Sequence, residues 1–310
     1  MRLHGAAMVR NEADVIEAFV RHNLAFLDAL TIVDNDSVDG TSEILVKLHA
    51  EGLPLRVSRD PAPVYRQSDT MTALARELLS VDGADFVFAL DADEFLKAES
   101  RNSLERALAA VPPRTHAAMH WLTYVPDSFD SDSWAFGPGH LWWRLKTERH
   151  RLRKVIVGRI LLDRSDDVLA TGSHAVHSRD GSNLQPHALL REGALALAHC
   201  PVRGRAQLEG KIVVGYLAHV VARAKGADHW RALYAELRDG VVLSEDRLRE
   251  IACNYGLPRK MWLPPPQIEL IEDPVRLNAE LRYGVEARPD ALQLLMRYTE
   301  SLIASMQTSA

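Results

Sequence analysis

Residues 85–96, DFVFALDADEFL, join an apolar run directly to a cluster of acidic side chains. Residues 86–90 are all apolar, and a short apolar run between polar residues is typical of a strand buried in a sheet. Asp91, Asp93 and Glu94 follow within four positions. The segment therefore predicts a buried strand whose carboxyl end carries concentrated negative charge.

Strand-like and helical patterns alternate through the first hundred residues. Regular alternation of this kind is typical of parallel βαβ units, in which helices cover both faces of the sheet. We therefore predict an α/β fold. Strands are expected at residues 3–9, 29–33, 53–58 and 84–90, and helices at 15–27, around 44–48 and at 68–79.

The pattern changes after Leu96. Residues 115–177 hold strand-like pieces separated by polar loops, and helical patterns dominate from residue 203 onward. We expect a mostly parallel sheet flanked by helices, with a helical C-terminal extension packed on it. The expected boundary separates residues 1–203 from residues 204–310.

The composition restricts the class of protein. The chain has 310 residues, of which 47% are hydrophobic and 25% charged, the mix of a soluble globular protein. A net charge of −5 provides no basic field for nucleic acid or an anionic membrane. Two cysteines, Cys200 and Cys253, form no disulfide framework. No signal peptide is apparent, and no apolar run approaches the roughly 18 residues of a membrane helix. We therefore expect a cytoplasmic protein without a transmembrane segment.

Three polar clusters directly follow expected strands: RNEAD at residues 10–14, DNDSVDGT at 34–41 and DADE at 91–94. Ligands of open α/β sheets bind beyond the carboxyl ends of the strands, so the clusters are expected to share one edge. The first loop contains no glycine and the chain contains no GxxxxGK[ST], which argues against dinucleotide-binding and P-loop sites. A pyrophosphate would then need another counter-charge. Mg²⁺ or Mn²⁺ held by the DADE carboxylates would supply it.

The order of these motifs resembles that of the family 2 glycosyltransferases of the GT-A fold, in a branch of small bacterial enzymes. The similar segments are RNEADVIEAFVRHNLAFLDALTIVDNDSVDGTSEIL, FALDADEFL, RKVIV, TGSH and AHCPVRGRAQLEGKIVVGY, which lie within residues 3–216. The resemblance implies that residues 1–203 form a nucleotide-sugar-binding catalytic domain. It also implies metal-dependent transfer of a sugar, with inversion, from a nucleotide diphosphate donor to an acceptor hydroxyl. A glycan, a lipid-linked molecule or a protein would each fit as acceptor.

The resemblance also implies roles for individual side chains. Asp91 and Asp93 match the D-x-D motif, which contacts the donor's ribose and the divalent cation, with Asp93 as the direct ligand. His174 of TGSH completes the metal or phosphate shell and is expected, with Asp93, to be catalytic. His177 and His199 compete with His174 for this role.

The loops after the first two strands are implied to hold the base and ribose, which places Arg10, Asn11, Asn35 and Asp36 in the donor pocket. Family members commonly have DDGS where this chain has DNDS, so Asn35 stands where an aspartate often reads the base. An amide both donates and accepts hydrogen bonds, which leaves the nucleotide open. Asn11 also has a structural interpretation as a helix cap.

Other side chains have competing interpretations. Arg203 and Lys211 are expected near a diphosphate, or else as solvated charges. Lys154 begins an expected strand, where an ordinary edge charge is the plain interpretation. The aromatic residues Trp134, Trp142 and Trp143 either stack on acceptor sugars or pack in the core. The sequence does not identify the carboxylate that would act as the catalytic base. The candidates, in loops expected to border the acceptor, are Asp127, Asp130, Asp132 and Glu148.

Two other functions fit part of the pattern. A sugar nucleotidyltransferase also combines an α/β sheet, Mg²⁺ and carboxylates, but generally has a glycine-rich basic first loop, unlike MVRNEAD. A relative that binds nucleotide or glycan without turnover is the non-enzymatic alternative. Donor hydrolysis that depends on Asp93 would separate these alternatives.

Overall fold

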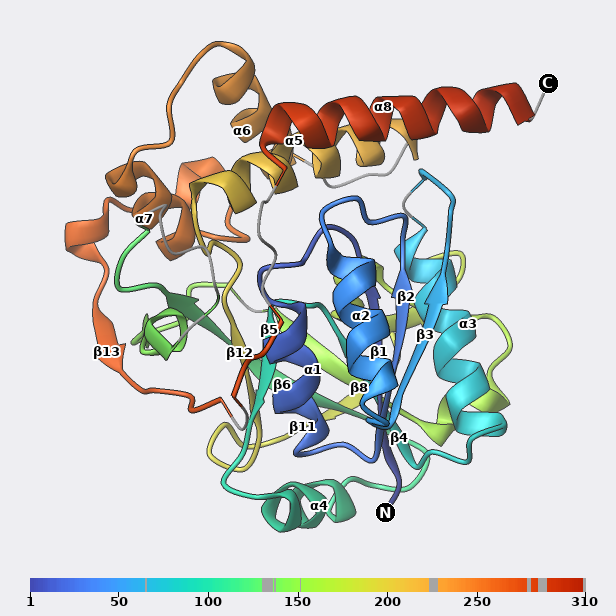
Figure 1. Cartoon of the computed structure of the whole chain (residues 1–310). Coiled ribbons are helices and arrows are strands. Elements are labelled where there is room, and N and C mark those ends of the chain that lie inside the picture. The colour runs from blue at the N-terminus through green and yellow to red at the C-terminus, as the bar shows by residue number, and fades with distance from the viewer. Residues whose placement is uncertain are drawn as a thin grey trace.

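The chain folds around one large mixed β-sheet with helices on both faces, which confirms the predicted fold class (Figure 1). The computed structural model describes residues 1–64, 66–129, 136, 138–150, 152–222, 228–277, 280–283 and 289–308. The strands run in the order β13-β7-β6-β8-β4-β1-β2-β3. Strands β3, β2, β1 and β4 are parallel, whereas β8 pairs antiparallel with both β4 and β6. Residues 3–90 therefore form a four-stranded parallel part of the sheet.

The parallel part consists of four strands and the helices that connect them. The strands are β1 Leu3–Val9, β2 Ala29–Asp34, β3 Leu55–Arg59 and β4 Phe86–Leu90. The helices are α1 Ile16–Leu24, α2 Thr41–Ala50 and α3 Gln67–Ser80.

Strand β1 shows why both faces of this sheet are covered. Successive side chains of a strand point to opposite faces. Leu3 and Ala7 lie in the apolar core with α1 and α2, whereas Ala6 and Met8 lie in the core with α3. The near-continuous apolar sequence of this strand is thus explained by burial on both sides.

Strand β12 Ala196–His199 is inserted between β5 Glu94–Lys97 and β6 His116–Val125. It pairs antiparallel with β5 and parallel with β6. The register places His199 opposite Glu94 on one side and opposite Thr123 on the other. A late segment of the chain thereby lies beside DADE, just after β4.

The C-terminal segment contains the predicted helices, which are α5 Arg205–Val221, α6 Asp228–Arg238, α7 Glu245–Cys253 and α8 Ala291–Thr308, but between α7 and α8 it also contributes one strand to the sheet. Helices α5 and α8 lie side by side over the end of the sheet where β1 and β2 finish (Figure 1). Gly210 permits this close approach, since a Cβ there would lie 2.6 Å from Leu294 Cδ1. Within the described residues, no helix has both the length and the apolar character needed to cross a bilayer.

The remaining elements are shorter. The helix α4 is Arg101–Ala109. The strands are β7 Trp143–Leu145, β8 Arg153–Gly158, β9 Asp167–Leu169, β10 Val176–Ser178, β11 His187–Leu189 and β13 Leu270–Glu272. Single 3₁₀ turns occur at Pro138–Leu141, Arg159–Asp163, Thr171–Ser173, Arg259–Met261 and Pro265–Gln267.

Candidate functional site

The two aspartates of DADE follow β4 directly and have different partners. Asp91 is one-third exposed; its Oδ1 accepts a hydrogen bond from Gln67 Nε2 at 3.0 Å, and its Oδ2 accepts one from Lys154 Nζ at 2.7 Å. Asp93 is buried, and its Oδ2 accepts a hydrogen bond from Lys211 Nζ at 2.6 Å. The motif therefore supplies one carboxylate that faces outward and one that is enclosed.

Lys154 is a buried counter-charge rather than the edge charge that the sequence indicated. It lies in β8, is 0% exposed, and its Nζ is 2.7 Å from Asp91 Oδ2 and 2.8 Å from Glu94 Oε2. Burial alone would lower the pKa of Lys154, but the two carboxylates raise it above its ordinary value. Burial raises the pKa of Glu94 well above its usual range despite Lys154. One ammonium thus lies within hydrogen-bonding distance of two adjacent carboxyl groups.

A second charged cluster surrounds Asp93. The buried guanidinium of Arg203 donates from Nε to Asp14 Oδ2 at 2.6 Å and from Nη2 to Glu12. Its Nη1 is 3.6 Å from Asp93 Oδ2. Burial would raise the pKa of Asp93, but the neighbouring cations Lys211 and Arg203 hold it below its usual range. Three carboxylates and two fixed cations therefore meet at the carboxyl ends of β1 and β4.

Glu12 is the member of this cluster that titrates near neutral pH. Burial raises its pKa from 4.5 to about 7, against the opposing charges of Arg203 and Lys211. Because the folded state then binds the proton more tightly than the unfolded chain does, Glu12 lowers stability as pH rises from about 4.5 to about 7.

The Glu12→Gln variant is therefore expected to gain free energy of unfolding relative to wild type between about pH 5 and about pH 8. Urea denaturation at the two pH values measures this difference. Glu43→Gln, at an exposed position of α2, is the matched control. A difference between Glu12→Gln and wild type that stays constant with pH would contradict the assignment.

Trp121 of β6 packs against three histidine rings near the two charged clusters. The rings of His150, His174 and His199 lie against its indole, with centroid distances of 4.7, 5.2 and 4.2 Å. Trp121 is 5% exposed, and its Nε1 has no hydrogen-bond partner among the described residues. Three imidazoles from separate segments therefore converge on one aromatic side chain.

The three histidine candidates lie in different places. His174 donates from Nδ1 to the Arg153 carbonyl at 3.0 Å, and burial, with the charge of Lys154, lowers its pKa to about 4. His199 Nε2 lies 3.6 Å from Asp93 Oδ1, and burial lowers its pKa well below the usual range. His177 is in the β9–β10 hairpin, where its Nδ1 bonds to the Ser178 carbonyl at 2.7 Å. His174 and His199 are thus neutral imidazoles at the site, beside Lys154 and Asp93 respectively.

Arg10 and Asn35 hold the loop that follows β3. Arg10 donates from Nε to the Asn35 carbonyl at 2.6 Å, and its Nη2 donates to the carbonyls of Ala62 and Pro63. Asn35 Nδ2 donates to the Ala62 carbonyl at 2.8 Å. Asn35 Oδ1 is buried with no hydrogen-bond partner among the described residues. These two side chains join three loops, and one amide oxygen is left to accept a hydrogen bond.

Asn11 and Asp36 shape the loops after β1 and β2. Both have positive φ angles, 57° and 56°. Asn11 Oδ1 accepts a hydrogen bond from the Val38 amide at 2.8 Å, and the Asn11 amide donates to Ser37 Oγ at 3.0 Å. The helix-cap interpretation of Asn11 is wrong, because Val15 occupies the N-cap of α1 and no side chain caps it.

Several side chains at the site were not predicted from the sequence. Glu12 and Asp14 stand within RNEAD, so their place after a strand was the available signal. Gln67, which contacts Asp91, and Trp121 carried no local signal at all. Their positions depend on packing between distant segments.

The structure describes only some of the residues predicted to border the acceptor. Asp127 is exposed, whereas Glu148 accepts hydrogen bonds from both the amide and the hydroxyl of Thr123 and is 3.1 Å from His150. Trp142 is 38% exposed and Trp143 is half-buried. The residues Asp130, Asp132 and Trp134 lie outside the described residues.

The residue types at the site are suitable ligands for a divalent cation. Carboxylate oxygens suit Mg²⁺ and Mn²⁺, which use one or two carboxylates together with substrate phosphates. Asp93 Oδ1 lies 3.6 Å from His199 Nε2, longer than a hydrogen bond, and His199 Nδ1 is buried with no hydrogen-bond partner among the described residues. Within the described part of the chain, no three His, Cys, Asp or Glu side chains converge as a metal site. Asp91, Asp93 and His174 are thus not assembled as one set of ligands, and their joint metal role stays a prediction.

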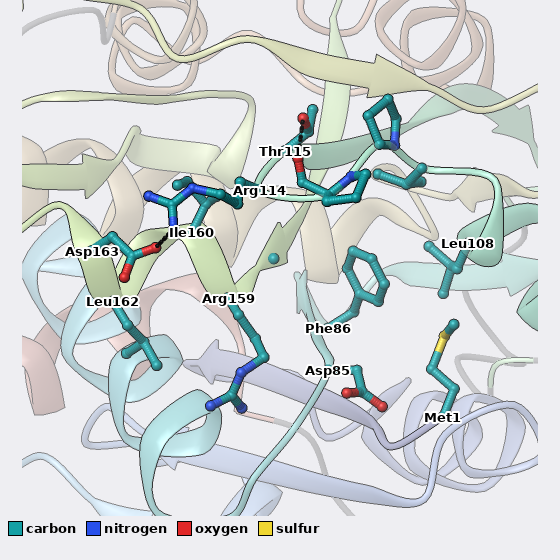
Figure 2. Close-up of a pocket in the computed structure, with 14 residues that line it drawn as sticks. Met1, Asp85, Phe86, Leu108, Arg114, Thr115, Arg159, Ile160, Leu162 and Asp163 are labelled. Carbon is teal, nitrogen blue, oxygen red and sulfur yellow. Dashed lines mark hydrogen bonds and ion pairs between the residues drawn. The ribbon is translucent and has the colours of Figure 1, made fainter.

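The pocket in Figure 2 lies at the opposite end of β4 from Asp91 and has a volume of about 700 Å³. It is lined by Asp85 and Phe86, where β4 begins, and by Arg159 and Ile160, just after β8. Arg159 donates hydrogen bonds to the carbonyls of Leu79 and Ala84, so its guanidinium has a structural role. This pocket is separate from the charged site.

No protein-family profile matches the chain, and no curated protein matches its sequence. Among solved structures, it is similar to S. aureus TarS residues 1–349, with a TM-score of 0.39, 16% identity, and coverage of 84% of this chain and 76% of that one. It is also similar to a mannosyltransferase from Pyrobaculum calidifontis in complex with GDP-Man and Mn²⁺, with a TM-score of 0.38, 17% identity, and coverage of 77% and 79%. A third is glucosyl-3-phosphoglycerate synthase from Mycobacterium tuberculosis with Mn²⁺ and UDP, with a TM-score of 0.26, 15% identity, and coverage of 39% and 44%.

Proposed function

We propose that the protein is a metal-dependent, inverting glycosyltransferase that moves a sugar from a nucleotide diphosphate donor to an acceptor hydroxyl. The observation that carries this proposal is the pair Asp91 and Asp93 at the carboxyl end of β4, enclosed by the cations Lys154, Lys211 and Arg203. This is the edge at which ligands of α/β sheets bind. The composition supports a cytoplasmic location, and the proposed acceptor is a glycan, lipid-linked or protein hydroxyl.

In this proposal the donor lies across the carboxyl ends of the parallel strands. Its nucleoside occupies the loops after β1, β2 and β3, where Asn35 Oδ1 offers a buried acceptor. Its diphosphate lies at DADE. When bound there by Asp93 and Asp91, Mn²⁺ or Mg²⁺ stabilises negative charge on the departing diphosphate.

The chain's own cations act on the same charge. Lys211 is 24% exposed and hydrogen-bonded to Asp93, so its ammonium lies where phosphate oxygens would arrive. Arg203 is buried and ion-paired to Asp14 and Glu12, so it holds the first loop against Asp93. Fixed charges of this kind need no rearrangement as the sugar–phosphate bond breaks.

The test is a thermal-shift panel of UDP, GDP, CDP and TDP, each with and without Mn²⁺, on wild type and Asp93→Asn. A ligand at about 100 times its dissociation constant stabilises a protein by about 2.7 kcal/mol. A shift for one nucleotide that needs both Mn²⁺ and Asp93 supports the proposal and identifies the base. No shift with any nucleotide would favour a relative without this activity. Donor hydrolysis that depends on Asp93 then separates turnover from binding.

The histidine roles make a separate prediction. His199→Ala and His174→Ala are both expected to weaken Mn²⁺-dependent nucleotide binding, because each removes a neutral imidazole beside a DADE carboxylate or its lysine. Titration of the nucleotide with and without Mn²⁺ measures the effect. His177→Ala, in the β9–β10 hairpin, is the control and should bind as wild type does. Unchanged affinity in both site variants would remove histidine from the proposed metal shell.

A further inference from the structure

The last helix, α8, contacts loops at the end of all three first strands. Ser301 Oγ donates to Asp36 Oδ2 at 2.7 Å, and Arg297 donates to the Val38 carbonyl, both after β2. Tyr298 Oη donates to the Pro63 carbonyl after β3 at 3.3 Å. The guanidinium of Arg10, after β1, lies over the Tyr298 ring at 5.5 Å from its centroid. One helical face therefore holds the three loops that surround Asn35.

The same helix is joined to the charged end of the site through α5. Leu294 and Tyr298 pack against Val214 and Ala218 of α5 in a small apolar core. One turn before Val214 in α5, Lys211 bonds to Asp93. The α5–α8 pair thus contacts both the DADE end of the site and the loops at its other end.

We propose that α8 is part of the donor site, with Ser301 and Tyr298 as positioning residues for the loops that bind the nucleoside. This inference rests on the proposed function, because it assigns those loops to a nucleotide. Neither side chain is placed in contact with the donor; each acts through Asp36, Arg10 or Pro63. The loss of either hydroxyl should therefore weaken nucleotide binding without abolishing the fold.

The physical reason is the conformation of the loop after β2. Asp36 has a φ of 56°, a left-handed conformation that costs free energy for a residue other than glycine. Its carboxylate is held from two sides, by Arg59 Nη2 at 2.8 Å and by Ser301 Oγ. Arg59 is 68% exposed, whereas Ser301 is half-buried on a packed helix. Ser301 is therefore the better fixed of the two contacts.

The experiment compares full-length variants with wild type by calorimetric titration of UDP, GDP, CDP and TDP in the presence of Mn²⁺. Ser301→Ala removes the hydroxyl, and Ser301→Thr retains it. Tyr298→Phe removes only the phenolic oxygen from a ring in the apolar core. Met296→Ala is the matched control, because Met296 is on the outer face of α8 and 55% exposed. Melting temperature without ligand is recorded for each variant.

Ser301→Ala is expected to weaken binding of the preferred nucleotide about fivefold, the equivalent of about 1 kcal/mol for one net hydrogen bond. Ser301→Thr should restore it, Tyr298→Phe should fall between, and Met296→Ala should match wild type. Amide hydrogen exchange at residues 36–38 should be faster in Ser301→Ala. Wild-type affinity in both Ser301→Ala and Tyr298→Phe would overturn the inference while leaving the proposed function intact. Absence of nucleotide binding by wild type would overturn both.

Discussion

Replacing Asp93 with asparagine is expected to lower turnover by a factor on the order of 10²–10³, the effect of removing one group that stabilises charge in a reaction. The substitution keeps the shape of the side chain but removes the negative charge on which Lys211, Arg203 and His199 converge. Both the bound cation and the position of the Lys211 ammonium would be affected. Steady-state transfer or donor hydrolysis, measured with and without Mn²⁺, gives the result.

The control for Asp93→Asn is the same substitution at Asp239, whose side chain is 62% exposed. The fold should persist in both variants, because Glu12 and Asp14 continue to compensate Arg203. Circular dichroism and the melting temperature check this point. Turnover of Asp93→Asn within a few-fold of wild type would exclude Asp93 from the chemistry.

The largest expected effect on stability is that of Lys154→Met. Methionine has a similar length and fills the buried space, but it leaves Asp91 and Glu94 without their shared ammonium. Removing one partner of a buried ion pair destabilises a protein by about 3–5 kcal/mol. Urea denaturation of wild type and variant measures the loss in free energy of unfolding.

Two further variants serve as controls for the stability loss in Lys154→Met. Lys146→Met removes a lysine that is 53% exposed and paired to Glu269, and such exposed pairs contribute about 0–1 kcal/mol. The double variant Lys154→Met with Asp91→Asn also removes the Asp91 carboxylate, which lies 2.7 Å from Lys154 Nζ in wild type, and should recover part of the loss. A loss below about 1 kcal/mol in Lys154→Met would show that water or another cation replaces the ammonium.

The sequence alone predicted the parallel part of the sheet because that signal is local. An apolar run such as residues 86–90 indicates its own burial, and the polar clusters mark the strand ends. The convergence of RNEAD, DNDSVDGT and DADE on one edge follows from parallel topology, and the structure confirms it. The position of Asp91 and Asp93 at the carboxyl ends of the parallel strands was predictable for this reason.

The environment of each site residue was not predictable in the same way. Lys154 was interpreted as an edge charge because nothing near it in sequence shows that β8 lies beside β4. The structural interpretation of Asn11 as a cap is wrong because its partners, Ser37 and Val38, are on another loop, whereas its place in the donor pocket stays a prediction. The role of α8 follows from contacts more than 200 residues apart, such as Ser301 with Asp36. Such pairings are decided by the packing of the whole chain.

The insertion of β12 between β5 and β6 has a consequence for synthesis on the ribosome. Asp93 emerges 118 residues before Lys211, its hydrogen-bonded partner. Until β12 has been made, one side of both β5 and β6 lacks its neighbouring strand, and until α5 has been made, a nascent chain that closed this end would enclose Asp93 without Lys211. The edge of the sheet that carries DADE is therefore expected to close late, after translation has passed Lys211.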